Sequence, residues 1–259
     1  MVRKATFPRF AAKVHHPSII EPAQFAHRYL PGVRAPPRCL LVWQRGLAPR
    51  LARRFRGRRI PGLDGTYAVP ATPYPVGVSF PRGVGGPSTV VRCEELAALG
   101  TKEFIGVGFA GSLSPELHPG DVIVCDGAVR DEGTSHHYAH ASVPALPSAA
   151  LLGWVTKTLA ESSISSRTGP SWTTDAPYRE TGAELRHYRG RGVLTVEMEA
   201  AALFIFARHR GLRAASVFVV SDVLTEERWE PHFHRMGGTL EKVATAILRA
   251  SRRAEGQPV

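Results

Sequence analysis

Long apolar runs are missing from this sequence of 259 residues. No segment approaches the roughly 20 consecutive apolar residues that a membrane-spanning helix needs, which excludes such a helix. The N-terminal stretch is basic, with the sequence MVRKATFPRFAAKVHHPS, yet it lacks the apolar core of a secretory signal. We therefore expect no membrane partner, and we interpret the first residues as a short disordered tail.

Cysteine is also rare, and Cys39, Cys93 and Cys125 lie far apart in the chain. They form neither a metal-binding pattern nor a disulfide framework, which favours the reducing cytoplasm as the location. The glycine turn at 83–86 is too short for a dinucleotide-binding fingerprint. We therefore expect a cytoplasmic protein that uses no metal ion and no other cofactor.

Acidic residues are outnumbered, with 22 against 33 basic residues, and the formal net charge is +11. Such a charge is typical of proteins that bind nucleic acid. However, the densest basic run, 53–59, contains a single aromatic residue and no nucleic-acid-binding motif. Biased codon usage or an anionic substrate also accounts for the many arginines. We expect no nucleic-acid partner, whereas the alternative of a nucleic-acid binder predicts steeply salt-dependent binding.

Short apolar segments alternate with helical patterns along most of the chain. We predict strands at 39–43, 76–80, 103–109, 122–129, 192–198 and 214–222. We predict helices at 21–30, 48–55, 88–100, 147–161, 199–211 and 237–253, the second half of the third being rich in leucine and alanine. The polar segment 162–182 is interpreted as a loop. This alternation predicts one α/β domain with a mostly parallel sheet covered by helices.

Acidic residues stand where two of these strands end. Glu197 and Glu199 come at the end of one strand, and Asp222 ends another. Ligands of such sheets bind beyond the carboxyl ends of the strands. A buried carboxylate needs partners, so the glutamates either cap and pair within the fold or bind the hydroxyls of a ribose diol. Asp222 is either a turn or N-cap residue, or a buried acid that donates a proton to a leaving group.

Two long blocks resemble the purine nucleoside phosphorylase and uridine phosphorylase family, which includes the nucleosidases. One is TVEMEAAALF followed by VVSD, and the other is GVGGPSTVVRCEELAALG followed by FIGVGFAGSLSPELHPGDVIVCDGAVRDEGTSHHY. The resemblance covers roughly two thirds of the chain. It implies a single nucleoside phosphorylase-like domain at 36–253, with a mixed, mostly parallel sheet partly closed into a barrel. An N-terminal arm at 1–35 and a disordered tail at 254–259 flank this domain.

The resemblance also implies a reaction, the phosphorolysis of the N-glycosidic bond of a nucleoside to give free base and ribose 1-phosphate. Glu199 matches the carboxylate that binds the ribose diol, and Met198 matches the methionine beneath the sugar. Glu197 matches a glutamate nearer the base and sugar edge. His16, or its neighbour His15, stands where a histidine of a neighbouring subunit reaches the 5′ end of the sugar.

For the base, Asp222 matches the acid with which the purine-acting branch protonates or hydrogen-bonds N7, and Ser221 precedes it in the same motif. Arg235 falls where an arginine assists that proton transfer; the alternative for Arg235 is a solvated residue before the last helix. Tyr178 and Trp172 are candidates for stacking on the base, with ordinary packing as the alternative.

The pyrimidine-acting branch reads uracil with a glutamine and an arginine in the loop that contains Tyr178. This chain has Arg179 there but no glutamine, which favours a purine base. Family members form dimers and trimers of dimers, so we expect a homo-oligomer whose other partners are a nucleoside and, as co-substrate, phosphate.

The expected phosphate site departs from the family pattern. The G-D-P-x-R turn is replaced by GLAPR, which supplies Gly46 and Arg50 without the aspartate. The second phosphate arginine is replaced by Gly106, and a hydroxyl residue by Phe109, although the backbone of Gly108 can still bind an anion. These departures keep two alternatives open: a nucleosidase that uses water on the same bond, and a catalytically inactive relative that binds a nucleoside.

Overall fold

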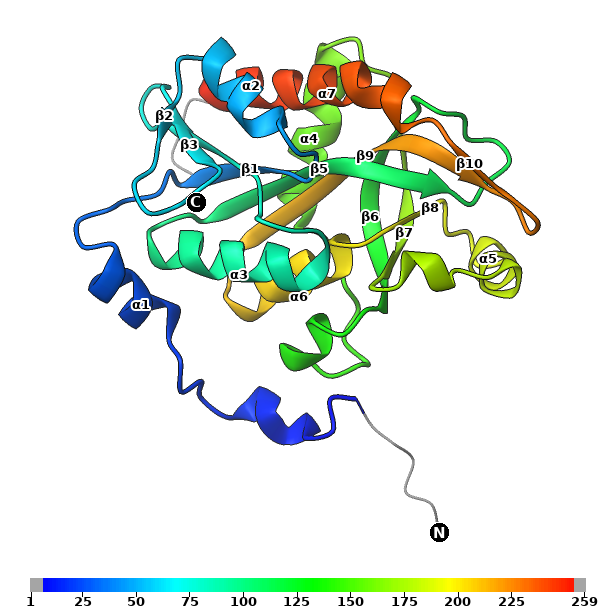
Figure 1. The fold of residues 1–259 in the computed structure, drawn as a ribbon, viewed down its shortest axis with the longest axis horizontal. Coiled ribbons are helices and arrows are strands. Elements are labelled where there is room, and N and C mark those ends of the chain that lie inside the picture. The colour runs from blue at the N-terminus through cyan, green and yellow to red at the C-terminus, as the bar shows by residue number, and fades with distance from the viewer. Residues whose placement is uncertain (1–6, 254–259) are drawn as a thin grey trace.

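The computed structural model of the chain describes residues 7–253, and Figure 1 shows their arrangement. The predicted tail at 254–259 and the first six residues of the predicted arm lie outside the described residues. The helices are α1 (Pro22–Tyr29), α2 (Leu47–Arg54), α3 (Gly85–Ala98), α4 (Ala149–Glu161), α5 (Gly182–Arg189), α6 (Ala200–His209) and α7 (Phe233–Arg253), with short 3-10 helices η1 (Ala11–His15), η2 (Ser135–His137) and η3 (Pro177–Arg179). No helix within residues 7–253 has the length and apolar character that crossing a membrane requires.

The strands form one sheet of ten. They are β1 (Arg38–Val42), β2 (Arg58–Arg59), β3 (Thr66–Val69), β4 (Val76–Ser79), β5 (Glu103–Ser112), β6 (Val122–Asp131), β7 (Arg167–Thr174), β8 (Thr195–Glu197), β9 (Arg213–Leu224) and β10 (Trp229–Pro231). Their order is β10-β9-β6-β7-β8-β5-β1-β4-β3-β2, with an additional pairing of β9 with β5. This last pairing closes β5, β6, β7, β8 and β9 into a barrel.

The long strand β5 makes the closure possible by changing its neighbour halfway along. Its first half pairs in parallel with β1, and its last two residues, Gly111 and Ser112, pair antiparallel with β8. Along its whole length β5 also pairs in parallel with β9, with a register shift between Ala110 and Gly111. Bulges of this kind bend a strand and increase its twist. The predicted mixed α/β sheet that closes partly into a barrel is therefore confirmed.

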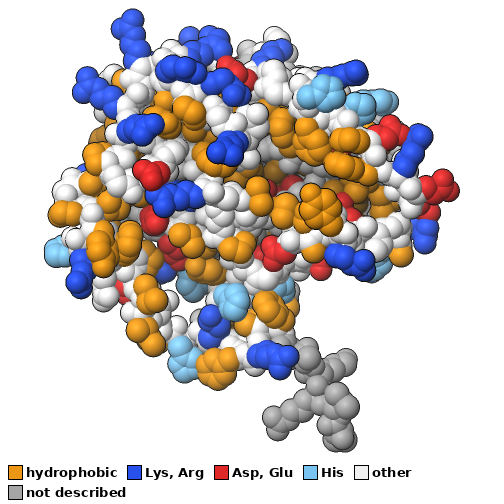
Figure 2. All heavy atoms as spheres, in the orientation of Figure 1, with side chains coloured by type: hydrophobic (Ala, Val, Ile, Leu, Met, Phe, Trp, Pro, Cys, Tyr) orange, Lys and Arg blue, Asp and Glu red, His pale blue; other side chains and the backbone are white. Residues whose placement is uncertain are grey.

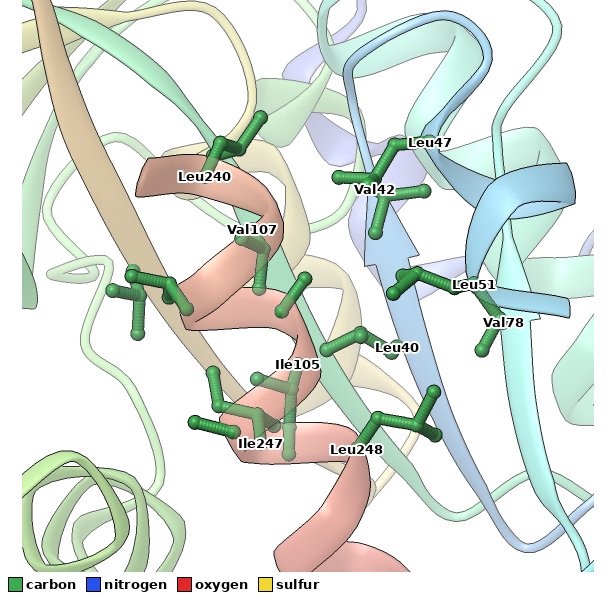
Figure 3. Close-up of a cluster of buried hydrophobic side chains, with 14 of the residues drawn as sticks. Leu40, Val42, Leu47, Leu51, Val78, Ile105, Val107, Leu240, Ile247 and Leu248 are labelled. Atoms are coloured by element: carbon green, nitrogen blue, oxygen red, sulfur yellow. The ribbon is translucent and has the colours of Figure 1, made fainter. Parts of the chain in front are cut away.

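Helices cover both faces of the open part of the sheet. Helix α7 lays its apolar stripe on β1 and β5 (Figure 3), where Leu240, Ile247 and Leu248 lie close to Leu40 and other strand residues. Helices α2 and α4 complete this layer, and α3 and α6 pack on the opposite face. Each such buried leucine or isoleucine contributes about 1.5–3 kcal/mol to the free energy of unfolding. The packed helices therefore keep the strands and their ends in fixed positions.

The loop predicted at 162–182 is wrong in part, because the segment contains β7, η3 and the first residue of α5. Strand β7 lies between β6 and β8, and most of its buried side chains are polar, with Trp172 as the exception. The Ser171 hydroxyl donates to the Thr195 carbonyl at 3.2 Å, and the Thr173 hydroxyl donates to Glu197. Hydrogen-bond partners that are distant in sequence therefore satisfy these buried hydroxyls. For this reason the segment can form a buried strand although its sequence is typical of a loop.

Helix α3 also begins earlier than predicted. Its N-cap is Val84 and not Ser88, which lies inside the first turn. The Ser88 hydroxyl instead accepts a hydrogen bond from the Gly83 N–H at 2.8 Å. The glycine turn thus runs directly into the helix and points the free backbone N–H groups of the helix start toward the end of β8.

The described part of the N-terminal arm runs along the outside of the domain (Figure 1). Helix α1 packs on α3, and η1 contacts η2 through Lys13 Nζ and His137 Nδ1, which are 3.1 Å apart. Several large apolar side chains of the arm are exposed, among them Phe10, Ile19 and Ile20, the last two at 95% and 84%.

Candidate active site

A cavity of about 590 Å³ lies beyond the ends of β5, β8 and β9. Segments 177–185 and 224–229 and the first residue of α7 complete its walls. Figure 2 shows a hollow near the middle of this face, with hydrophobic side chains around it and acidic side chains within it. The cavity contains seven of the residues that we predicted for the site: Trp172, Tyr178, Glu197, Met198, Glu199, Ser221 and Asp222.

Glu197 holds the start of α6. One oxygen of its buried carboxylate accepts the backbone N–H groups of Glu199 and Ala200, both at 2.7 Å, and the other accepts the Thr173 hydroxyl. Burial raises the pKa of Glu197 to about 7, although these hydrogen bonds act in the opposite direction. Both oxygens of Glu197 accept hydrogen bonds from the protein itself, which fits the capping alternative. Glu197 thereby fixes the position of Glu199.

Replacing Glu197 is accordingly expected to affect folding first. Glu197→Ala leaves two buried N–H groups and one hydroxyl without their acceptor, and should lower the free energy of unfolding by about 3 kcal/mol. Urea denaturation followed by circular dichroism measures this. Glu161→Ala is the control, because Glu161 is exposed on α4 in a surface pair with Lys157, and its effect should stay within about 0.5 kcal/mol. A loss below about 1 kcal/mol for Glu197→Ala would contradict the capping role.

Glu199 is the N-cap of α6, and its side chain lies at the start of another helix, α3. The Gly85 N–H donates to Glu199 Oε1 at 2.7 Å, where the dipole of α3 favours negative charge. Burial nevertheless raises the pKa of Glu199 to about 8, and the nearby Glu197 adds to this. Glu199 also lines the cavity beside Met198, so a carboxylate and a thioether face the same space. A sugar diol fits this pair chemically, since the diol donates two hydrogen bonds and its ring is apolar on one face.

Asp222 lies near the end of β9, where it pairs with Gly111 of β5. Its Oδ1 accepts the Ser221 hydroxyl at 2.7 Å, and its Oδ2 accepts the Trp229 indole N–H at 2.8 Å. The side chain of Asp222 is buried, while Trp229 is 57% exposed. The carboxyl group is therefore held from two sides and can form a further hydrogen bond toward a ligand.

The two predicted stacking residues differ in their surroundings. Tyr178 is 98% exposed at the rim of the cavity and is free to cover a bound ring. Trp172 is 1% exposed, its indole N–H donates to Asp131 Oδ2 at 2.9 Å, and its ring packs on Tyr188. Trp172 therefore belongs to the packed wall, which matches the alternative of ordinary packing.

Two of the predicted residues lie away from the cavity. Arg235 is exposed in the first turn of α7 and is not part of the cavity wall. The helix begins at Phe233, so its first turn directs Phe233, and not Arg235, toward the cavity. His16 follows η1 on the arm, where its ring stacks on Phe10 at 6.0 Å, and within this chain it does not reach the cavity.

The predicted phosphate residues do not line the cavity either. Arg50 donates from Nε to Glu241 at 3.2 Å and from its guanidinium to Gln44 at 3.1 Å. Gly46 is the N-cap of α2 with a φ of 85°, a conformation that favours glycine. The structure thus ties this turn to α7 through Arg50 and Glu241.

Gly108 faces a side chain that the sequence did not suggest, the indole of Trp43. A Cβ atom at Gly106 would lie 2.2 Å from this ring and one at Gly108 would lie 2.7 Å from it. The Trp43 N–H donates to the Thr89 hydroxyl at 2.9 Å, and the ring stacks on Phe218. The two glycines therefore make room for Trp43, which lines the cavity in the region where phosphate was expected.

Carboxylates dominate the cavity, although the whole chain is basic. Its described lining residues include six acids and one basic residue: Glu180, Glu197, Glu199, Asp222, Glu226, Glu227 and Arg228. Arg228 pairs with Glu230 at 2.7 Å. In their ionised form these acids favour positive charge that develops on a sugar ring, and they disfavour an anion unless a cation accompanies it.

Glu180 is the main site residue that the sequence reasoning missed. It stands between η3 and the N-cap Thr181 of α5, so its backbone is fixed on both sides. Burial, followed by the charges of Asp222 and Glu184, raises the pKa of Glu180 to about 7. The sequence carries a signal for the start of α5, the capping-box pattern T-x-x-E at Thr181–Glu184. A helix that starts there places the acid Glu180 directly before its N-cap.

Comparisons with known proteins agree with this architecture. Residues 72–251 match a family model described as the phosphorylase superfamily. Guanosine phosphorylase of Halorubrum lacusprofundi is 33% identical over 138 residues, which are 53% of this chain and 57% of that protein. Uridine phosphorylase of Escherichia coli is 30% identical over 185 residues, 66% of this chain and 73% of that protein.

A solved structure shares the fold. The crystal structure of uridine phosphorylase from Vibrio fischeri has a TM-score of 0.71 and 23% sequence identity, covering 85% of this chain and 93% of that one. The segment matched by the family model contains Glu197, Glu199 and Asp222, three acids that line the cavity at or near the ends of β8 and β9.

Proposed function

This chain belongs to the phosphorylase superfamily, and we propose that it is a nucleoside phosphorylase that acts on a purine nucleoside. Phosphate cleaves the N-glycosidic bond and the products are the free base and ribose 1-phosphate. The observation that carries the proposal is the cavity itself. It joins Met198 and Glu199 from the end of β8 with Ser221 and Asp222 from β9.

In the proposed reaction the bond between C1′ and N9 breaks and its electron pair leaves with the base. Glu199 accepts hydrogen bonds from the ribose hydroxyls and stabilises the positive charge that develops on the sugar. Asp222 donates a proton or a hydrogen bond to N7 and so neutralises the charge on the departing purine. A phosphate oxygen then bonds to C1′. Phosphate would enter the cavity beside Trp43, whose ring covers Gly106 and Gly108 there, and Arg50 would have to leave Glu241 and turn toward the cavity to bind it.

A purine is the proposed base because Asp222 and Glu180 line the same cavity close enough for their charges to interact. Asp222 suits N7, and Glu180 can accept N–H donors from the far edge of the ring. The exposed ring of Tyr178 supplies a surface for stacking. Relatives of this chain include a guanosine phosphorylase and uridine phosphorylases, so uridine belongs in any test of the substrate.

A nucleosidase is the second candidate, and one observation favours it. The Trp43 ring covers Gly106 and Gly108, and Arg228, the basic residue among the described lining residues, is already paired with Glu230. Water is neutral and does not require a cation in this acidic cavity. If the protein is a nucleosidase, the same residues hold the nucleoside and only the attacking molecule differs.

One experiment distinguishes these functions. The protein is incubated with inosine, guanosine, adenosine and uridine, each with and without phosphate, and the free base is followed. Release that depends on phosphate supports the phosphorylase, and release without phosphate supports the nucleosidase. Release from uridine alone contradicts the purine assignment. No release from any nucleoside contradicts both enzymes and leaves an inactive relative that binds nucleosides.

We also propose a homo-oligomer in the cytoplasm. The arm exposes Phe10, Ile19 and Ile20, and a second copy of the chain would remove this apolar surface from water. The three cysteines are free and buried, as suits a reducing compartment. Analytical ultracentrifugation should give a mass of at least twice 28.1 kDa, and Ile19→Ser with Ile20→Ser should shift it toward the monomer. A monomeric wild-type protein at micromolar concentration would contradict the oligomer.

A further inference from the structure

Trp229 is a half-exposed residue that contacts the proposed acid, Asp222. Its indole N–H donates to Asp222 Oδ2 at 2.8 Å, and Trp229 itself lines the cavity. The contact joins two paired strands, because Trp229 is opposite Leu224 and Pro231 is opposite Asp222 in the β9–β10 ladder. The indole therefore approaches Asp222 from a fixed direction.

Several contacts hold the hairpin that carries Trp229. The Thr225 N–H donates to the Arg228 carbonyl at 2.9 Å, and the Arg228 N–H donates to the Thr225 hydroxyl at 3.0 Å. The Trp229 ring packs against Phe233 at 6.2 Å between centroids, and Phe233 packs against Phe109 at 6.0 Å. Trp229 as a whole nevertheless stays 57% exposed, so it contributes little to the hydrophobic core.

We propose that Trp229 is a positioning residue for Asp222, and that its N–H orients the carboxyl group so that the remaining hydrogen-bond position faces N7 of the leaving purine. This inference rests on the proposed function, in which Asp222 serves the leaving base. Ser221 fixes the other oxygen at 2.7 Å. Together the two donors define the plane of the carboxyl group.

The chemistry of the indole suits this task. An indole N–H donates one hydrogen bond, accepts none and carries no charge, so it orients the carboxyl group without placing a cation beside it. An arginine would add a positive charge that favours the ionised carboxylate. Arg235, the arginine expected to assist Asp222, is exposed on α7 away from the cavity wall. In this chain a neutral donor from β10 therefore occupies the position next to the acid.

The test compares Trp229→Phe and Asp222→Asn on two substrates. Guanosine needs a proton or hydrogen bond at N7 when its base leaves, whereas 7-methylguanosine carries a fixed positive charge there and needs neither. Trp229→Phe removes the N–H and keeps an aromatic ring, and kcat for guanosine should fall about tenfold. For 7-methylguanosine kcat should change less than about twofold. Asp222→Asn should show the same selectivity with a larger loss on guanosine.

The outcomes distinguish the positioning role of Trp229 from the proposed function on which it rests. Equal losses on both substrates in Trp229→Phe, while Asp222→Asn remains selective, would overturn the positioning role and leave the proposed function intact. Lack of selectivity in Asp222→Asn would instead contradict the acid role of Asp222. A second readout uses guanosine alone: a lower kcat with KM within about twofold supports positioning, and a raised KM with unchanged kcat assigns Trp229 to base stacking and overturns it.

Discussion

Asp222→Asn is expected to lower kcat for guanosine or inosine by about 100-fold or more, while KM changes less than about threefold. The amide of asparagine can donate a hydrogen bond but cannot deliver a proton, so the charge on the departing purine is only partly neutralised. The proposed ribose contacts remain, because the substitution leaves Glu199 and Met198, which follow β8, unchanged. Steady-state release of free base at saturating nucleoside measures the loss.

Asp126→Asn is a matched control for this variant. Asp126 is also an aspartate on a strand, β6, but it is exposed and lies outside the cavity wall. Its variant should retain the full rate. A full rate in Asp222→Asn as well would show that the leaving base needs no acid at this position, and the proposed reaction would lose its step at N7.

Glu199→Gln is expected to lower kcat/KM for ribonucleosides by about 100-fold, because it removes the negative charge beneath the developing cation. A 2′-deoxynucleoside should lose less, since it lacks one of the two hydroxyls that Glu199 is proposed to bind. Glu199→Ala should in addition weaken nucleoside binding, which calorimetry detects as a raised Kd. Unchanged nucleoside binding by Glu199→Ala would contradict the diol role.

The pH profile provides an independent check on Glu199. Burial raises its pKa to about 8, so the free protein carries mostly the protonated carboxyl group at neutral pH. The ionised form is the one that stabilises positive charge on the sugar. The wild-type kcat/KM should therefore rise with pH and level off above about pH 8, and this rise should disappear in Glu199→Gln. Glu161→Gln, on the surface of α4, should retain the wild-type profile.

Much of the fold was accessible from the sequence because apolar side chains follow the periods of buried strands and helices. Strands β1, β4, β5, β6, β8 and β9 and helices α1, α2, α3, α4, α6 and α7 lie where these patterns predicted them. The position of the carboxylates followed from the same logic, because Glu199 and Asp222 come where buried strands end. The cavity brings these two residues together.

The remaining parts depend on contacts between segments that are distant in sequence. Most buried side chains of strand β7 are polar, and the distant hydrogen-bond partners of Ser171 and Thr173 are what permits their burial. The Trp43 ring, one residue beyond β1, fills a space that Gly106 and Gly108 of β5 leave open, a match that no local pattern encodes. Trp229 reaches Asp222 because a hairpin folds β10 back on β9. Each case requires the sheet order, which the sequence alone does not specify.

The placement of the tryptophans has a practical consequence. Three of the four in the chain, Trp43, Trp172 and Trp229, line the cavity. Their fluorescence therefore originates mostly from around one chamber, and the emission of half-exposed Trp229 should be sensitive to whatever replaces water beside it. The protein thus carries its own optical reporter, and titrations with unlabelled compounds can be read directly from intrinsic emission, with Trp154 as a more distant background.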